Sequence, residues 1–318
     1  MRMCAKPNKV VAVATANDLK KAQEFAKETK LEDAKTYGSY EELLTDSDAH
    51  CEWVCNAAKH NKHILCEKPL AGTAEEVKRM MEVQKSTGVL IMEAFWTRFF
   101  PAYKVLRDVL KSKEFGEVKA VTASYGTCTL PDNRTETQID ECPLNDIGSY
   151  LIQFALMCAN DQPPTKLHIE GAKNKEGVDT SGNITLEFEN GRVKAYLVYT
   201  IEANTANNAC VAFEKGLCEF PEFFNAPTRI LKTQGKAKPG HSSSEVFEFP
   251  FEEDLEKYNF TSSSGLRYEA DHCYDLLQQG SRQSDIMSLE TSLRVVEVVA
   301  ELRQQMGVKL STDAEVKS

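Results

Sequence analysis

The sequence predicts an α/β protein: an incomplete Rossmann-like dinucleotide-binding domain, then an α+β domain with a largely antiparallel, open-faced sheet. The segment 63–101 has the pattern strand, helix, strand, which is the unit of a parallel sheet. Later segments alternate apolar and polar residues between tight turns, as antiparallel strands do. A chain of 318 residues is long enough for two domains. We expect them at 1–98 and 99–310, followed by a loose tail at 311–318.

The strand–helix–strand unit begins with the apolar run His63–Cys66. The segment Glu67–Pro69 ends this strand, because proline cannot continue a central strand. A capping-box sequence at Thr73 starts the helix, Gly88 ends it, and Val89–Met92 forms the second strand. Ligands bind beyond the carboxyl ends of such strands, so the polar residues that follow the first strand are candidate site residues.

The first part of the chain matches only part of a dinucleotide fold. Lys9–Ala14 is a buried strand by composition, and Asp18 is placed to cap a helix at Leu19–Thr29. The glycine-rich turn GxGxxG, which lets backbone N–H groups approach a pyrophosphate, does not precede them. The segment Asp46–His63 also reads as shortened, with at most a short strand at Trp53–Cys55 and no room for a complete helix. We therefore expect weak or absent cofactor binding.

The second part of the chain is rich in strands. We expect helices at Ala102–Lys113, Asp146–Met157, Gly265–Gln279 and Leu289–Met306, and strands at Val118–Tyr125, Lys166–Ala172, Asn183–Phe188, Val193–Ile201, Ala209–Phe213 and Arg229–Lys232. The polar stretch between the first of these strands and the second helix reads as a loop. Short turns between alternating segments favour one antiparallel sheet with helices on one face.

Composition excludes several classes of protein. A net charge of −10 and a pI near 5.3 disfavour nucleic acid and anionic membranes as partners, since both attract basic surfaces. No apolar run approaches the roughly 20 residues that span a bilayer, and the first residues lack the apolar stretch of a signal peptide. Ten cysteines occur without a CxxC pair, as expected of reduced thiols. We expect a cytoplasmic protein that acts on a small molecule.

A metal site is the main competing interpretation of one cysteine- and histidine-rich segment. Cys51, Cys55, His60, His63 and Cys66 offer five soft ligands within a short stretch. Their spacing fits no usual zinc knuckle, however, and the last two belong to a predicted strand. We therefore predict no metal.

Six motifs together resemble a known family. They are VVAVA, YGSYEELL, LCEKPLA, MEAFWTRFFP, DIGSY and LRYEADH, and they extend from about Val10 to Val308. The chain resembles the glucose–fructose oxidoreductase/inositol dehydrogenase/MocA (Gfo/Idh/MocA) family and, within it, the group of dimeric dihydrodiol dehydrogenases.

The resemblance assigns roles to residues around a nicotinamide. Lys68 would touch the nicotinamide ribose and the reacting hydroxyl, and Glu67 would help to orient the ribose. Trp96 and Arg98 would line the nicotinamide pocket. Asn17 occupies the region that contacts the ribose or phosphate, although asparagine is also common in turns for backbone reasons alone.

The resemblance also assigns the acid–base residues. Asp146 and Tyr150 match the DxGxY motif of the family, in which the tyrosine position exchanges the hydroxyl proton. This chemistry is reasonable, because a lysine cation beside a tyrosine stabilises the phenolate and lowers a pKa that is ordinarily about 10.

The function implied is an NADP-dependent oxidoreductase that moves a hydride from a trans-dihydrodiol or an aldopyranose, such as D-xylose, to the cofactor. The sequence does not decide between NAD and NADP, because the second strand ends in neither a clear acidic residue nor an arginine. The alternative is a catalytically inactive relative that serves as a dimerisation or binding module. The resemblance also implies a homodimer.

Overall fold

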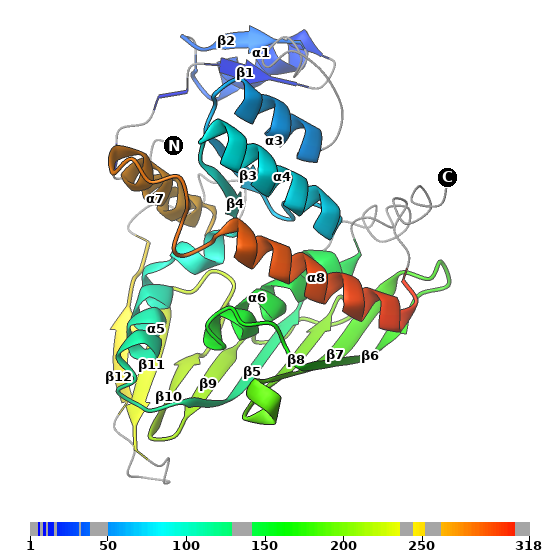
Figure 1. Cartoon of the computed structure of the whole chain (residues 1–318), viewed down its shortest axis with the longest axis vertical. Coiled ribbons are helices and arrows are strands. Elements are labelled where there is room, and N and C mark those ends of the chain that lie inside the picture. Colours follow the sequence, from blue (N-terminus) through cyan, green and yellow to red (C-terminus); the bar gives the residue numbers. More distant parts are fainter. Residues whose placement is uncertain are drawn as a thin grey trace. The chain divides into compact units, whose positions relative to one another are not determined.

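The structure is a computed structural model that describes residues 6, 9–10, 12–15, 18–31, 33–38, 50–128, 142–235, 244–251 and 262–308. The chain divides into two compact units (Figure 1). The first contains residues 1–95 and 264–292, and the second contains residues 96–263 and 293–318. A segment late in the chain therefore belongs to the unit formed by the beginning of the chain.

The first unit contains short parallel strands and their connecting helices. Its elements are β1 (Ala12–Ala14), α1 (Leu19–Glu28), β2 (Lys35–Tyr37), α3 (His50–Lys59), β3 (Ile64–Glu67), α4 (Ala74–Thr87), β4 (Ile91–Ala94) and α7 (Arg267–Gln278). β1 pairs with β2 and β3 pairs with β4, both in parallel, as two separate sheets.

Two helix starts predicted from the sequence are confirmed. The side chain of Asp18 accepts a hydrogen bond from the backbone N–H of Lys21 at the start of α1. Thr73 and Glu76 form the capping box of α4, and Gly88 ends that helix with φ of 68°, a left-handed conformation that costs glycine little. Local side-chain chemistry thus fixes where these helices begin and end.

The prediction of a short strand at Trp53–Cys55 is wrong, as is the prediction that this segment lacks a complete helix. These residues lie inside α3. Cys51, Val54, Cys55 and Ala58 are all buried and are spaced i, i+3, i+4, i+7, so one helical face packs inward. A short apolar run of this kind has the same composition in a strand and in a buried helix, which explains the error.

The strand pairs match the outer parts of a Rossmann sheet. A Rossmann sheet has the strand order 3-2-1-4-5-6, in which strands 1 and 4 form the central pair. Strands 3 and 2 lie on one side of this pair, and strands 5 and 6 lie on the other. Each described pair is parallel with a helix between its two strands, and no described strand joins the two pairs. Exposure agrees with an edge position for β3: Leu65 is 39% exposed, whereas every residue of β4 is buried.

The second unit is built on one large sheet. Its strands are β5 (Val118–Gly126), β6 (Lys166–Lys173), β7 (Asp179–Phe188), β8 (Val193–Thr200), β9 (Ala209–Phe213), β10 (Gly216–Phe220), β11 (Arg229–Gln234) and β12 (Ser244–Glu248). Their order is β12-β11-β10-β9-β5-β8-β7-β6, and only the β5–β8 pair among them is parallel. The predicted, largely antiparallel sheet is confirmed. β10 and β12 were not predicted from the sequence, because they are short and interrupted by charged residues.

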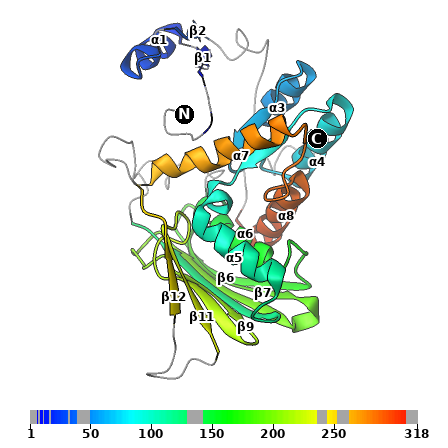
Figure 2. The same cartoon turned by 90° about the vertical axis from the view of Figure 1, so that its left-hand side faces the viewer.

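Helices of the second unit lie on one face of this sheet (Figures 1 and 2). They include η1 (Trp96–Phe99), α5 (Pro101–Ser112), the π-helical turn η3 (Leu144–Gly148), α6 (Ser149–Cys158) and α8 (Leu289–Met306), which begins in the first unit. The short turn η4 (Glu189–Gly191) instead joins β7 to β8. All ten residues of α6 are buried, and this helix packs on β5 and β8. On the other face of β8, Tyr196 and Val198 are 49% and 43% exposed. The sheet is therefore open on that side, as predicted.

Within the described residues, none of the helices combines the length and apolar character that crossing a membrane requires.

Candidate active site

In the first unit, a buried carboxylate holds the turn that follows β3. Glu67 is exposed at the strand end, Lys68 is half-buried, and the Lys68–Pro69 peptide bond is cis. The backbone N–H of Lys68 donates to the Glu67 carboxylate at 3.3 Å. The N–H of Leu70 donates at 2.9 Å to the carboxylate of Glu93, a residue of β4 that is only 2% exposed. Glu93 therefore fixes the backbone directly after the candidate lysine.

A second buried carboxyl lies in the same unit. Glu269, in the first turn of α7, is 3% exposed, and its Oε2 atom has no hydrogen-bond partner among the described residues. Burial, and to a lesser degree the negative charge of Glu67, raise the pKa of Glu269 to about 8. This side chain therefore carries a proton at neutral pH. Glu269 lies in the motif LRYEADH, but no role was predicted for it from the sequence.

In the second unit, the candidate base is held by a tryptophan. The indole Nε1–H of Trp96 donates to the Tyr150 hydroxyl at 3.1 Å, and both residues are 8% exposed. The ring of Tyr125 meets that of Tyr150 edge-on, with 5.6 Å between centroids. Asp146 is half-buried in η3, four residues before Tyr150, so the two lie on the same side of the continuous helix.

The start of this helix is fixed by a buried aspartate on β7. Asp179 is fully buried, and its Oδ2 accepts from the backbone N–H of Leu144 at 2.8 Å and from the hydroxyl of Tyr199 at 2.7 Å. Burial raises the pKa of Asp179, while these two hydrogen bonds act in the opposite direction. The turn that carries Asp146 is thereby tied to the sheet.

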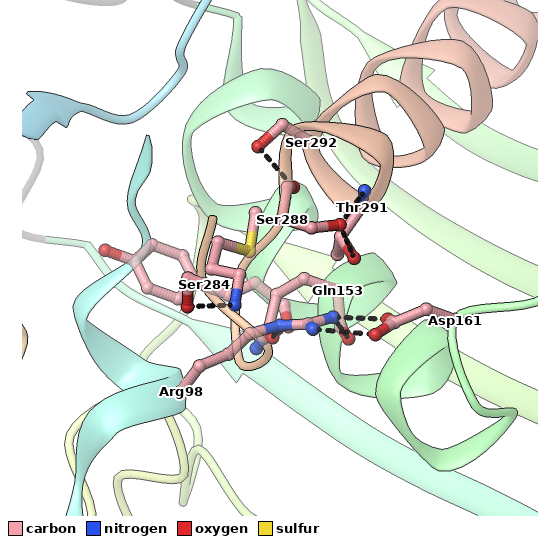
Figure 3. Close-up of polar contacts among 9 residues, drawn as sticks. Arg98, Gln153, Asp161, Ser284, Ser288, Thr291 and Ser292 are labelled. Atoms are coloured by element: carbon pink, nitrogen blue, oxygen red, sulfur yellow. Dashed lines mark hydrogen bonds and ion pairs between the residues drawn. The ribbon is translucent and has the colours of Figure 1, made fainter. Parts of the chain in front are cut away.

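Arg98 makes a buried network inside the second unit (Figure 3). Its side chain is 1% exposed, and Nε donates to Gln153 Oε1 at 2.9 Å. Its two terminal nitrogens donate to both carboxylate oxygens of Asp161 at 3.1 and 2.8 Å, and one of them also donates to the backbone carbonyl of Gln153 at 2.9 Å. The guanidinium thus binds groups of its own unit, while a cofactor contact for Arg98 stays a prediction.

The predicted site residues are therefore divided between the units. Glu67 and Lys68 lie in the first unit, and Trp96, Arg98, Asp146 and Tyr150 lie in the second. Within the second unit, the structure brings Trp96 and Tyr150 into direct contact. Asn17 lies outside the described residues. The part of the chain that the structure describes contains no group of three or more histidine, cysteine, aspartate or glutamate residues able to hold a metal ion.

Two ends of a dinucleotide would meet different surroundings in the first unit. The exposed carboxylate of Glu67 and the ammonium of Lys68 are suitable partners for a ribose at the exit of β3. A pyrophosphate usually binds a helix N-terminus that follows a glycine-rich turn. The N-termini of α1 and α4 instead bind carboxylates or hydroxyls of their own segments, and the 318 residues contain no G-x-G. The exit of β3 therefore fits the nicotinamide end, whereas the starts of α1 and α4 do not offer the pyrophosphate an uncapped helix end.

Comparison with known proteins settles the family. Residues 2–95 match the oxidoreductase family with an NAD-binding Rossmann fold, and residues 103–219 match the Gfo/Idh/MocA C-terminal domain. The trans-1,2-dihydrobenzene-1,2-diol dehydrogenase of Xenopus laevis is 35% identical over 314 residues, which are 95% of this chain and 91% of the frog protein. The chain belongs to the Gfo/Idh/MocA family. It is therefore an NAD(P)-dependent oxidoreductase, and the inactive binding module is not favoured.

Other relatives agree with this assignment. The enzymes of the same name from Bos taurus and Homo sapiens are each 32% identical, over 98% and 96% of this chain and 93% and 91% of their own lengths. The 3-ketoreductase KijD10 from Actinomadura kijaniata, solved with NADP and TDP-benzene, has a TM-score of 0.74 at 22% identity and covers 95% of this chain and 91% of its own. A levoglucosan dehydrogenase solved with NADH and levoglucosan has a TM-score of 0.77 at 17% identity, covering 94% and 88%. At these identities the solved structures show a shared fold.

Proposed function

We propose that this protein oxidises a secondary alcohol of a trans-dihydrodiol, with NADP as the preferred acceptor. The observation that supports this most directly is the setting of Tyr150. Its hydroxyl is bonded to the indole of Trp96, and its ring packs against Tyr125, so the candidate base lies among aromatic side chains. Such surroundings suit a flat, ring-shaped diol. The relatives named for dihydrodiol oxidation provide independent support.

Each candidate residue has a distinct task in the proposed reaction. Tyr150 accepts the proton of the substrate hydroxyl while the carbon gives up a hydride. Asp146, one turn earlier, orients that hydroxyl. Lys68 contributes a positive charge that favours the oxygen as it loses its proton, and Glu67 binds the ribose. Acceptance of the hydride is the chemistry that a bound nicotinamide supplies.

We further propose a homodimer that forms through the open face of the large sheet. Two apolar side chains of β8, Tyr196 and Val198, point outward on that face. Substitution of Val198 by lysine would place a charge on this surface, so we expect sedimentation velocity to report a monomer. A variant that sediments as the wild type does would exclude this face.

The many cysteines that are free among the described residues favour a reducing compartment, the cytoplasm.

The activity test compares substrates and acid–base variants. Reduction of NADP is followed at 340 nm with the trans-dihydrodiol of benzene and, separately, with D-xylose. We expect turnover of the diol and a loss of about 100- to 10,000-fold in Tyr150→Phe, the usual contribution of general acid–base catalysis. Tyr274→Phe, in α7, is the matched control. Turnover of xylose alone would change the substrate class, and full activity of Tyr150→Phe would remove the proposed base.

A further inference from the structure

We propose that the turn Trp96–Phe99 is a positioning element that holds Tyr150 at both ends. Trp96 binds the hydroxyl of the tyrosine, and Arg98 holds its backbone through Gln153. The proposal rests on the proposed function of Tyr150 as the base. It assigns to Arg98 a task within the second unit and makes Trp96 a partner of the base.

The hydroxyl end accepts a hydrogen bond from a buried donor. Indole nitrogen is a donor only, so the Trp96–Tyr150 bond of 3.1 Å has one possible direction, and Tyr150 Oη is the acceptor. An acceptor oxygen gains more from this bond when it is negatively charged. The bond therefore favours the phenolate over the phenol, in addition to fixing the orientation of the ring.

The backbone end is held through a chain of buried bonds. Gln153 is fully buried, and its Nε2 donates to the carbonyl of Tyr150 at 3.1 Å. The Oε1 atom of the same side chain accepts from Arg98 Nε at 2.9 Å. On the far side of the guanidinium, both carboxylate oxygens of Asp161 accept hydrogen bonds from Arg98 (Figure 3). The amide of Gln153 thus links the arginine to the residue that carries the base.

One short turn carries both contacts. Trp96 and Arg98 are two residues apart in η1, and all four residues of η1 are buried. The hydroxyl of Thr97, between them, donates to the carbonyl of Asn225, so the turn is itself anchored within its own unit. A rigid support that binds both the backbone carbonyl and the hydroxyl of one residue restricts the movement of its side chain, which is what an acid–base residue requires.

The first experiment measures kcat/KM as a function of pH for wild type and Trp96→Phe. Loss of the donor removes the preference for the phenolate, so we expect the apparent pKa of the alkaline-rising limb to move upward by about 0.5–1 pH unit. Activity should fall about 3- to 10-fold below that pKa and recover at high pH. Trp53→Phe, a change at the other tryptophan of the chain, is the matched control. A loss of activity that is equal at all pH values would overturn this part of the proposal.

The second experiment separates positioning from cofactor contact. In Arg98→Lys we expect kcat to fall about tenfold with KM for NADP unchanged, because the fork of bonds to Gln153 and Asp161 is lost. Asp161→Asn keeps the arginine and should show a smaller fall in kcat, again with KM for NADP unchanged. This variant therefore tests the positioning role of Arg98 if Arg98→Lys does not fold. A raised KM with normal kcat would overturn the assignment of Arg98.

The activity of Tyr150→Phe separates a failure of the positioning role from a failure of the proposed base. If this variant is inactive and the profile of Trp96→Phe is not shifted, the positioning role fails while the proposed base stands. If Tyr150→Phe retains activity, the proposed function fails first.

Discussion

The buried carboxyl of Glu269 makes the stability of this protein depend on pH. The pKa of this group is raised in the folded protein from 4.5 to about 8, mainly by burial. Between these values the folded form keeps a proton that the unfolded form releases. The free energy of unfolding contributed by Glu269 is therefore fully present below pH 4.5 and is lost as pH rises through 8. Replacement by glutamine removes the titration and should remove this loss.

The magnitude follows from the two pKa values. Each unit of difference corresponds to about 1.4 kcal/mol, so the rise from 4.5 to about 8 gives roughly 5 kcal/mol between the two ends of the window. Glu269→Gln should resemble wild type at pH 5, where the wild-type side chain is neutral in the folded state. At pH 8.5 the variant should be more stable by several kcal/mol, since it carries no buried charge.

The assay is urea unfolding followed by far-UV circular dichroism at pH 5, 7 and 8.5. Asp179, whose pKa burial also raises, is present in both proteins, so its contribution cancels in the difference. Glu82→Gln, an exposed change in α4 of the same unit, is the control and should show no pH-dependent gain. The reasoning is refuted if the stability difference between Glu269→Gln and wild type is the same at every pH.

Two further predictions concern stability. Tyr199→Phe removes one of the donors to the buried Asp179 and should lower the free energy of unfolding by about 1–3 kcal/mol. Tyr196→Phe, an exposed change on the same strand, should be nearly neutral. A urea midpoint equal to that of wild type would show that the bond contributes nothing. Thr73→Ala should cost about 0.5–2 kcal/mol because it removes the capping box of α4, whereas Thr73→Ser should restore most of that loss in the same assay.

The sequence predicted those elements best that carry their own local signals. The helix Leu289–Met306 has the predicted limits at both ends, and the capping residues Asp18 and Thr73 make the predicted bonds. Alternation along Val193–Thr200 correctly placed a strand with one buried and one open face. In each case the pattern depends on neighbours within a few residues, so the sequence contains the necessary information.

Predictions that depended on distant neighbours were less complete. Trp53–Cys55 was assigned to a strand because a short apolar segment has the same composition in a buried strand and in a buried helix. The motif around Trp96 and Arg98 marked these two as candidate residues without showing that one binds the tyrosine and the other binds Gln153 and Asp161. These partners lie more than 50 residues away in the sequence, and no local pattern connects them.

The roles of the buried carboxyl groups could not be predicted for the same reason. Glu93 and Glu269 belong to family motifs, yet a glutamate is exposed in most proteins, and the sequence gives no measure of its burial. Glu93 binds the backbone of Leu70 across the β3–β4 unit, and Glu269 is brought into the first unit only by α7, from late in the chain. One signal was available in retrospect, because Glu93 interrupts an otherwise apolar strand.

The unequal fit of the two ends of the cofactor leads to a prediction about affinity. Glu67 and Lys68 offer a ribose polar partners, whereas the starts of α1 and α4 are occupied by Asp18 and by Thr73 with Glu76. If the pyrophosphate contributes little, NADPH should bind more weakly than micromolar, and reduced nicotinamide mononucleotide, which lacks the pyrophosphate and adenosine, should bind within about tenfold of it. Titration monitored by nicotinamide fluorescence measures both affinities on the same protein.

The comparison between the two ligands also tests the reasoning itself. Micromolar or tighter binding of NADPH, together with undetectable binding of the mononucleotide, would mean that the pyrophosphate end is the main anchor. A phosphate-binding backbone would then exist without a G-x-G turn, formed by parts of the chain other than the N-termini of α1 and α4. Weak and similar affinities would instead show that the strand exit at Lys68 binds the nicotinamide end without help from the pyrophosphate. The β3–β4 pair supports this, because it has its own crossover helix and its own buried carboxylate, Glu93, which holds the turn after β3.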